Sequence, residues 1–322
     1  MRTLTSVAPP RVQKEPKRIT GIQIGTMALG DHYGMLDEQG AVSIIQESVE
    51  RGVRFFDTSP AFGRGASEML LARALETETE RVSIATKALS AGDPPFHPLR
   101  RTSRERLLRD IEESLRRLGR HYLDLYYIYG DREGRMFDQT LDALFEIRES
   151  GLIRATGIYS TSSYFLRRAL RRGHVDAVMV PYNILNRPLD TDFLSFCRAA
   201  DVAVHACEPL FRGLLAGKLH RNSTFSQGDV RTADRRFRGD RFRRNIEIVE
   251  LLRLFADQEG LTLLELSLGW VLQHPSIKFA VCGARTPLQV EEIIKASATR
   301  LSLDQILEID FIVGSKKYQF ME

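Results

Sequence analysis

The sequence predicts an α/β protein built as a single (β/α)8 TIM barrel. Short β-branched or aromatic runs alternate with amphipathic runs almost from end to end, which is typical of a parallel sheet covered by helices. About eight strand candidates are present, the number that closes such a barrel. A length of 322 residues with 43% hydrophobic residues suits one large domain. We therefore expect the barrel domain to cover residues 19–322.

The predicted strands come first, because their order fixes the barrel. They cover residues 21–25, 54–57, 82–87, 123–129, 155–159, 177–181, 203–207 and 278–282. Helical periodicity fills the segments between most of them, at residues 37–51, 67–76, 103–118, 137–150, 162–172 and 190–200. Four of these runs are followed by Gly52, Gly119, Gly151 and Gly173, which suit the ends of helices.

The alternation lapses once, after the seventh predicted strand. Residues 211–244 form a long, polar, arginine-rich connection, and loops of that length are usually functional or lack regular structure. We interpret the arginine run in its second half as a solvated surface, with an anion clamp as the alternative. This run consists of Arg231, Arg235, Arg236, Arg238, Arg241, Arg243 and Arg244. Extra helices are predicted around the last strand, at residues 245–259, 262–273, 287–297 and 302–311.

Composition narrows the function classes. The net charge of +4 comes without a basic stripe interleaved with aromatic residues, so no nucleic-acid partner is predicted. Cys197, Cys207 and Cys282 have neither CxxC nor metal-ligand spacing, which favours a reducing cytoplasm and no metal site. Residues 1–18 are basic and polar and indicate a disordered leader. No apolar run is long enough to span a bilayer, so a cytoplasmic protein without a membrane partner is predicted, its oligomeric state open.

Candidate chemistry gathers where the predicted strands end, because the loops of a barrel converge at that edge. Asp57 and Lys87 end adjacent strands, so we expect a buried pair in which the carboxylate orients the ammonium. A purely structural salt bridge is the alternative. The other strand ends contribute the aromatic or polarisable residues Tyr129, Tyr159, Met179 and Cys207.

Several longer motifs occur in a fixed order along the chain. They are Phe56-Asp57-Thr58 with Ser67-Glu68, Ala85-Thr86-Lys87, Leu123-Asp124-Leu125-Tyr126, Pro181-Tyr182-Asn183, Gly213-Leu214-Leu215 and residues 283–292. Through these motifs the chain resembles the aldo-keto reductase superfamily from Gly21 to about Phe311. The resemblance implies NADPH as hydride donor and a tetrad of Asp, Tyr, Lys and His that protonates a carbonyl oxygen. This chain has Asp57 and Lys87, but Phe62 replaces the tyrosine and Tyr129 replaces the histidine.

The phenol of Tyr129 offers a substitute for the missing acid. It is predicted to enter the same mouth from a neighbouring strand, where the positive charge of Lys87 would make it more acidic. The alternative is that Tyr129 only packs against the substrate. The catalytic candidates are therefore Asp57, Lys87 and Tyr129.

The resemblance also locates the cofactor. At the nicotinamide end the family's polar and aromatic positions correspond to Tyr159, Ser160, Met179 and Cys207. We expect an altered substrate pocket lined by Phe62, Tyr159, Met179 and Cys207. Glu208 stands where a serine usually adjoins the pyrophosphate, and its charge would oppose binding unless it is protonated or turned away. At the adenosine end, Gly283, Arg285, Gln289, Glu292 and Lys218 match cofactor-binding positions.

Three functions remain open from the sequence. The first is an NADPH-dependent reductase of a small-molecule carbonyl with Tyr129 as the relocated acid. The second is a non-redox acid/base enzyme on the same barrel, such as a dehydratase, isomerase or cyclase, using Asp57, Lys87 and Tyr129. The third is a noncatalytic binding or regulatory protein.

Overall fold

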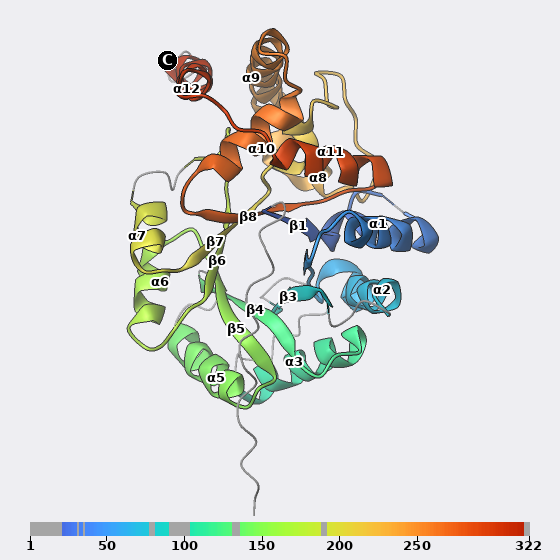
Figure 1. The fold of residues 1–322 in the computed structure, drawn as a ribbon, viewed down its shortest axis with the longest axis vertical. Coiled ribbons are helices and arrows are strands. Elements are labelled where there is room, and N and C mark those ends of the chain that lie inside the picture. The colour runs from blue at the N-terminus through green and yellow to red at the C-terminus, as the bar shows by residue number, and fades with distance from the viewer. Residues whose placement is uncertain are drawn as a thin grey trace, which may run out of the picture.

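The eight predicted strands close into one parallel barrel. The computed structural model describes residues 21–30, 32–34, 36–76, 81–89, 104–130, 136–187 and 192–318. The strands follow one another around the barrel in chain order and β8 closes on β1 (Figure 1). They are β1 (Ile22–Gly25), β2 (Phe55–Asp57), β3 (Ser83–Lys87), β4 (Leu123–Tyr129), β5 (Ile153–Tyr159), β6 (Ala177–Pro181), β7 (Ala203–Cys207) and β8 (Ile277–Cys282). The predicted fold class is confirmed, with strand bounds within two residues.

Strand periodicity separates the barrel interior from the layer under the helices. Along β4, Leu125 and Tyr127 belong to the small cluster inside the barrel, whereas Tyr126 and Ile128 join the large core between barrel and helices. Successive side chains of a strand point to opposite faces. Both faces of the sheet are therefore buried, as parallel barrel strands require. Leu125 and Tyr127 face the barrel interior, and Tyr129, the next residue of the same face, lies at the mouth where the strand ends.

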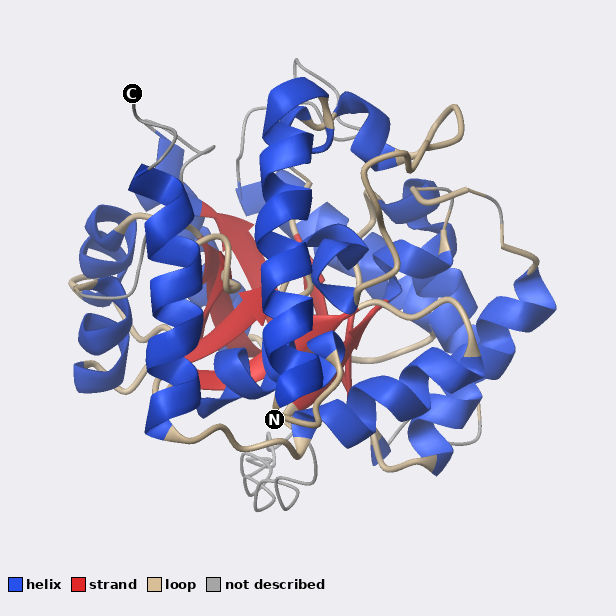
Figure 2. Cartoon of the chain, turned by 90° about the horizontal axis from the view of Figure 1, so that it is seen from above, coloured by secondary structure: helices blue, strands red, loops and turns tan. Residues whose placement is uncertain are grey.

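Helices surround the barrel on its outside (Figure 2). In order they are α1 (Glu38–Glu50), α2 (Ala66–Ala74), α3 (Arg104–Leu118), α5 (Phe137–Glu149), α6 (Ser163–Leu170), α7 (Phe193–Ala199), α9 (Gly239–Gln258), α10 (Leu263–Gln273), α11 (Pro287–Ser297) and α12 (Leu303–Tyr318). Local sequence sets several starts: the Asp37 side chain accepts from Gly40 N, and Thr262 forms a capping box with Glu265.

The long connection after β7 is more ordered than predicted. It contains the turn-rich segment η5 (Phe211–Ala216), the short helix α8 (Val230–Ala233) and η6 (Arg235–Phe237), and α9 starts at Gly239, six residues before the predicted start. Phe211, Phe237 and Phe242 pack on one another within it. The sequence pattern missed these elements because their apolar residues are spaced among many arginines.

Helices α9 and α12 pack together outside the barrel, at the β8 side (Figure 1). Helix α12 turns Leu303, Leu307 and Phe311 to solvent with exposed fractions of 69%, 57% and 68%, an apolar stripe that the sequence did not reveal. Among the described residues, no helix has both the length and the apolar character needed to cross a membrane. The predicted leader, residues 1–18, lies outside the described residues.

Candidate active site

Asp57 and Lys87 form the expected buried ion pair at the mouth of the barrel. Lys87 Nζ donates to Asp57 Oδ1 at 2.7 Å and Oδ2 at 2.8 Å, and to the carbonyl of Thr58 at 2.8 Å. Each of the two side chains is nearly excluded from solvent. Burial raises the pKa of Asp57, while the charge and hydrogen bonds of Lys87 oppose that shift. The three ammonium protons therefore have three acceptors within the chain.

A cluster of buried hydroxyl groups fixes the backbone beside the pair. Thr26 Oγ1 lies 2.9 Å from Thr58 Oγ1 and 2.5 Å from Ser67 Oγ, and Thr58 Oγ1 lies 3.0 Å from Ser67 Oγ. Thr26 also donates to the carbonyl of Asp57 at 3.2 Å. These bonds join η1 (Thr26–Leu29), β2 and α2, so the carbonyl that receives Lys87 sits on a braced segment.

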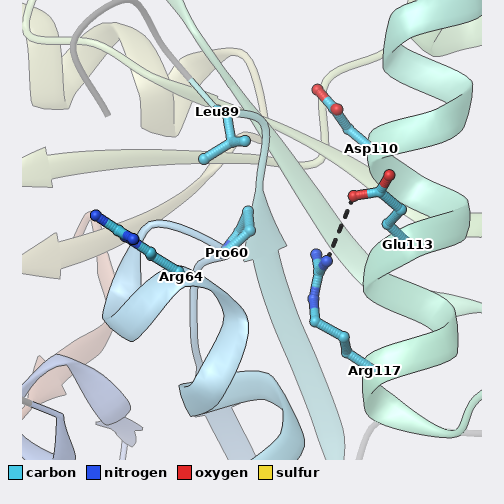
Figure 3. Close-up of a pocket in the computed structure, with 6 residues that line it drawn as sticks. All are labelled: Pro60, Arg64, Leu89, Asp110, Glu113 and Arg117. Atoms are coloured by element: carbon cyan, nitrogen blue, oxygen red, sulfur yellow. Dashed lines mark hydrogen bonds and ion pairs between the residues drawn. The ribbon is translucent and has the colours of Figure 1, made fainter. Parts of the chain in front are cut away.

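The Ser67-Glu68 motif braces the pair from the side of α3. Glu68 is 0% exposed; it accepts from Thr86 Oγ1 at 2.8 Å and from Arg117 Nε at 2.5 Å. Arg117 also reaches Glu113 at 3.5 Å (Figure 3). Thr86 immediately precedes Lys87, so this network ties β3 to a helix. The cavity drawn there, lined by Pro60, Arg64, Leu89, Asp110, Glu113 and Arg117, measures about 20 Å³, room for a water rather than a substrate.

Two aromatic rings adjoin the Lys87 ammonium. Its Nζ lies 5.6 Å from the centre of the Phe62 ring and 6.0 Å from that of Tyr127, within the range of cation–π attraction. Phe62 begins η2 (Phe62–Gly65) and also meets the ring of His32 edge-on at 5.5 Å. Phe62 thus occupies the position predicted for it, beside the ion pair, where it offers no proton.

The opposite side of the mouth is built from β4, β5 and β7. The rings of Tyr129 and Tyr159 lie 5.3 Å apart, and Cys207 Sγ lies 3.7 Å from Tyr159 Oη. The Cys207 sulfur and burial raise the pKa of Tyr159, and burial raises that of the Cys207 thiol, so both stay protonated near neutral pH. Met179 is only 1% exposed and belongs to the barrel interior, deeper than the pocket-lining position predicted for it.

Glu208, directly after β7, is ionised and paired. It accepts from Arg212 Nε at 2.8 Å and from Arg236 Nη1 at 2.7 Å. Burial would raise the pKa of Glu208, but the hydrogen bonds and charges of Arg236 and Arg212 lower it overall. Asp234 completes the network through Arg236 at 2.6 Å. The lowered pKa disfavours the protonated form that would have removed the charge of Glu208, and Arg212 and Arg236 neutralise the carboxylate instead. Arg236 belongs to the arginine run that the sequence assigned to a solvated surface.

The backbone of this segment is strained. Glu208, Phe211 and Arg212 have φ angles of 52°, 47° and 54°, in the left-handed region that costs energy for residues other than glycine. Such conformations persist only where surrounding contacts impose them. The ion pairs of Glu208 with Arg212 and Arg236 supply such contacts.

The predicted adenosine-side residues gather around the start of α11. Gln289 Oε1 accepts from the backbone N–H of Arg285 at 2.7 Å, and Lys218 Nζ lies 3.5 Å from Glu292 Oε2. The guanidinium of Arg285 donates to the carbonyls of Ala28 and Gly34, which ties β8 to the loop after β1. A side chain at Gly283 would meet Ala28 Cβ at 2.8 Å, so the glycine allows this close approach.

A second cavity, of about 190 Å³, opens beside Lys218. Its lining combines Gly217, Lys218, Leu219 and His220 of the segment after η5 with Val249, Glu250 and Arg253 of α9. It adjoins the adenosine-side group rather than the Asp57–Lys87 pair, because Lys218 belongs to both the cavity and the contact with Glu292.

Sequence reasoning missed a polar group inside the barrel. The sequence assigns no site role to Tyr127 or His205, yet the Tyr127 hydroxyl lies 2.8 Å from His205 Nδ1. Gln23 Nε2 lies 3.1 Å from the same nitrogen. Strand alternation could have indicated that these residues face inward. Each lies two residues from an inward-facing position on its strand, and side chains two residues apart point to the same face.

A sequence model of the aldo/keto reductase family matches residues 21–313. The aldo-keto reductase YhdN of Bacillus subtilis (strain 168) is 28% identical over 297 residues, which cover 91% of this chain and 89% of the relative. The NADH-specific methylglyoxal reductase of Escherichia coli (strain K12) is 27% identical over 314 residues, covering 90% and 95% of the two chains.

Solved structures have the same barrel. The glycerol dehydrogenase AKR11B4 from Gluconobacter oxydans superposes with a TM-score of 0.82 at 25% identity, covering 92% of each chain. An aldo/keto reductase from Klebsiella pneumoniae in complex with NADP and acetate has a TM-score of 0.69 at 22% identity, covering 91% of each chain, a likeness that concerns the fold.

Proposed function

Because the chain belongs to the aldo-keto reductase family of oxidoreductases, we propose that it is an NADPH-dependent reductase of a small-molecule carbonyl. The observation that carries this proposal is the Asp57–Lys87 pair, which is buried and braced on two sides at the carboxyl ends of β2 and β3. In a barrel, that edge is where catalytic groups meet substrate. The pair supplies a fixed positive charge to an oxygen that gains electron density during reduction.

Tyr129 is the proposed proton donor. It ends β4, the strand next to Lys87, and its ring is half-buried against Tyr159. Phe62 has no proton, and the three hydrogen bonds of Lys87 to Asp57 and Thr58 leave its ammonium saturated. The role of acid therefore falls to a neighbouring phenol, and Tyr129 stands where the family places its histidine.

The two halves of the cofactor are supported unequally. Arg285 and Lys218 offer positive charge beside the start of α11, a favourable place for the phosphate of the adenosine half. At the nicotinamide half the residues do not fit a carboxamide: Met179 is buried, and the Ser160 hydroxyl is buried and accepts from Ser162 N at 3.0 Å. The proposal therefore assigns residues of this chain to the proton transfer and to the adenosine end of the cofactor. It assigns none to the nicotinamide carboxamide.

The substrate proposed is a short carbonyl compound that carries hydroxyl groups. One relative is named for methylglyoxal and one similar structure for glycerol, both small oxygen-rich molecules. The mouth of this chain offers the phenols of Tyr129 and Tyr159, which suit hydroxylated ligands.

The test is cofactor binding followed by turnover. Isothermal titration calorimetry with NADPH, and with NADH as a comparison, should show saturable binding that Arg285→Met weakens. Stopped-flow oxidation of NADPH with short hydroxyaldehydes should then fall about a hundredfold in Tyr129→Phe, with Tyr164→Phe, on the outer surface of α6, as the matched control. Absence of NADPH binding at millimolar concentration would overturn the reductase and favour non-redox acid/base chemistry at the same pair. Full activity of Tyr129→Phe would remove Tyr129 as the acid.

A further inference from the structure

Three polar side chains meet on the axis of the barrel below Lys87. Gln23 of β1, Tyr127 of β4 and His205 of β7 come from strands that are not neighbours, and their exposed fractions are 0%, 0% and 2%. Barrel interiors are usually filled by branched apolar residues, and burying polar groups costs free energy unless they are hydrogen-bonded. We call these three residues the interior column.

Two contacts of the column meet at one ring nitrogen of His205. Gln23 Nε2 lies 3.1 Å from His205 Nδ1, and the Tyr127 hydroxyl lies 2.8 Å from the same nitrogen. Burial lowers the pKa of His205 to about 3, with the charges of Lys278 and Lys87 adding to the effect. His205 is therefore a neutral hydrogen-bond partner at the base of the column.

Aromatic packing fixes the imidazole. The ring of His205 meets those of Phe55 and Phe279 edge-on, at 5.7 and 5.0 Å. Tyr127 is confined as well, because an added Cβ at Gly157 would lie 2.4 Å from its ring. The phenol thus has one place to lie, with its oxygen toward His205.

The upper end of the column contacts the ion pair. Tyr127 is the register partner of Lys87 between β3 and β4, and its carbonyl accepts from Ala88 N at 2.8 Å. Its ring lies 6.0 Å from Lys87 Nζ, while Phe62 lies 5.6 Å from the same atom. A residue that moves the Tyr127 ring would therefore move the environment of the ammonium.

We propose that Gln23, His205 and Tyr127 are positioning residues that hold the Lys87 ammonium at the barrel mouth through the ring of Tyr127. None of them reaches the mouth itself, so their effect passes through Lys87. The predicted effect of this positioning on turnover rests on the proposed reductase activity. The predicted effect on the Lys87 ammonium does not depend on that activity.

The test uses the full chain and starts with nuclear magnetic resonance of the lysine ammonium groups. A buried, hydrogen-bonded ammonium exchanges its protons slowly, and the Lys87 signal is identified by its loss in Lys87→Met. In Tyr127→Leu we expect this signal to shift and its proton exchange to accelerate about tenfold. Tyr127→Phe, which keeps the ring and protects the fold, should give a smaller shift of the same sign.

His205 is tested by a pair of variants. His205→Leu removes the hydrogen-bond partner of Tyr127 and should shift the Lys87 signal, whereas His205→Gln keeps a polar partner and should leave the signal close to that of the unaltered chain. Leu125→Met, a change in the same interior cluster without a polar contact, is the control and should leave the signal in place. A Lys87 signal unchanged in both Tyr127→Leu and His205→Leu would overturn the proposal, even if both variants melt earlier.

Turnover gives the second measurement. For a substrate reduced by the unaltered chain, Tyr127→Leu should lower kcat about tenfold with little change in KM, and should move the pH profile. A lower melting temperature with kcat and pH profile unchanged would mean that the column only packs the core. Should the unaltered chain reduce no carbonyl, the reductase proposal fails while the ammonium signal still decides this one.

Discussion

The two sides of the barrel mouth differ in what their side chains contact. On the β2–β3 side, Asp57, Lys87 and Glu68 form charged hydrogen bonds within the chain and are almost fully buried. On the β5–β7 side, Tyr159 and Cys207 meet through a long sulfur contact, and Glu208 is held by arginines of the following loop. The first side is braced by hydroxyl groups and a helix. The second side is braced by a loop.

This difference suits two separate roles in the proposed reductase. A charged pair that is buried and supported from within needs no ligand to keep its geometry. Side chains that face a loop can be exchanged without disturbing the barrel, because loops tolerate change. We infer that the β2–β3 side preserves the family's charged pair, whereas the β5–β7 side sets which ligand is accepted.

The largest effect is expected from breaking the buried pair. Lys87→Met should lower turnover at least about a hundredfold and destabilise the fold by about 3–5 kcal/mol, because it leaves Asp57 buried without its partner. The double variant with Asp57→Asn should recover part of that stability in urea unfolding. Arg172→Met, which breaks an exposed pair with Asp142, is the matched control and should change stability little, because exposed pairs are screened by solvent. Equal losses of stability in Lys87→Met and Arg172→Met would contradict a special role for the buried pair.

Restoring a phenol beside Lys87 should sharpen the comparison. Phe62 lies 5.6 Å from the ammonium, so Phe62→Tyr places a proton donor on the β2–β3 side and should raise kcat about tenfold. Phe62→Leu removes the ring without adding an acid and controls for altered packing. If Phe62→Tyr slows the reaction as much as Phe62→Leu, the phenol at Tyr129 is already sufficient and the Phe62 ring itself is needed.

A smaller effect is expected on the β5–β7 side. Glu208→Gln removes one carboxylate from Arg212 and Arg236, and should tighten NADPH binding by about 1 kcal/mol, roughly fivefold in Kd, at low salt. The gain should shrink as salt is added, because screening weakens charge interactions. Glu146→Gln, which alters an exposed pair with Arg104, should leave the Kd unchanged. Calorimetry distinguishes the two, and weaker binding in Glu208→Gln would show that the carboxylate serves the loop structure first.

The smallest effect at neutral pH concerns His205. Its pKa is lowered to about 3 in the fold, whereas an unfolded histidine has a pKa of about 6.5. Below pH 6.5 the unfolded chain binds a proton that the native chain does not, so stability should fall by about 1.4 kcal/mol per pH unit as pH falls. Urea unfolding between pH 6.5 and 5 measures how steeply the free energy of unfolding changes with pH. His205→Gln should remove the contribution of His205 to that slope. An unchanged slope would show that His205 is protonated in the fold.

The sequence predicted the barrel and the charged pair because both depend on local patterns. Alternation locates strands, and a strand that ends in Asp57 or Lys87 delivers that residue to the mouth. Strand alternation indicates that Gln23 and His205 face inward, but it could not predict that the two side chains meet, because they are far apart in the chain and come together only after closure. Nor could it predict the partners of Glu208, since Arg236 reaches it from a segment without strand or helix periodicity. The role of Tyr129 remains a prediction.

The space beside Gly157 limits the order in which this interior can change. A methyl group there would overlap the Tyr127 ring at 2.4 Å, a distance that no small adjustment of a packed core relieves. Gly157→Ala should therefore be harmful in the unaltered chain, and should add little further loss in a chain that already carries Tyr127→Leu. Positions 157 and 127 therefore depend on each other, because a side chain at 157 needs the space that the Tyr127 ring occupies. Engineering of position 157 must begin with a smaller residue at position 127.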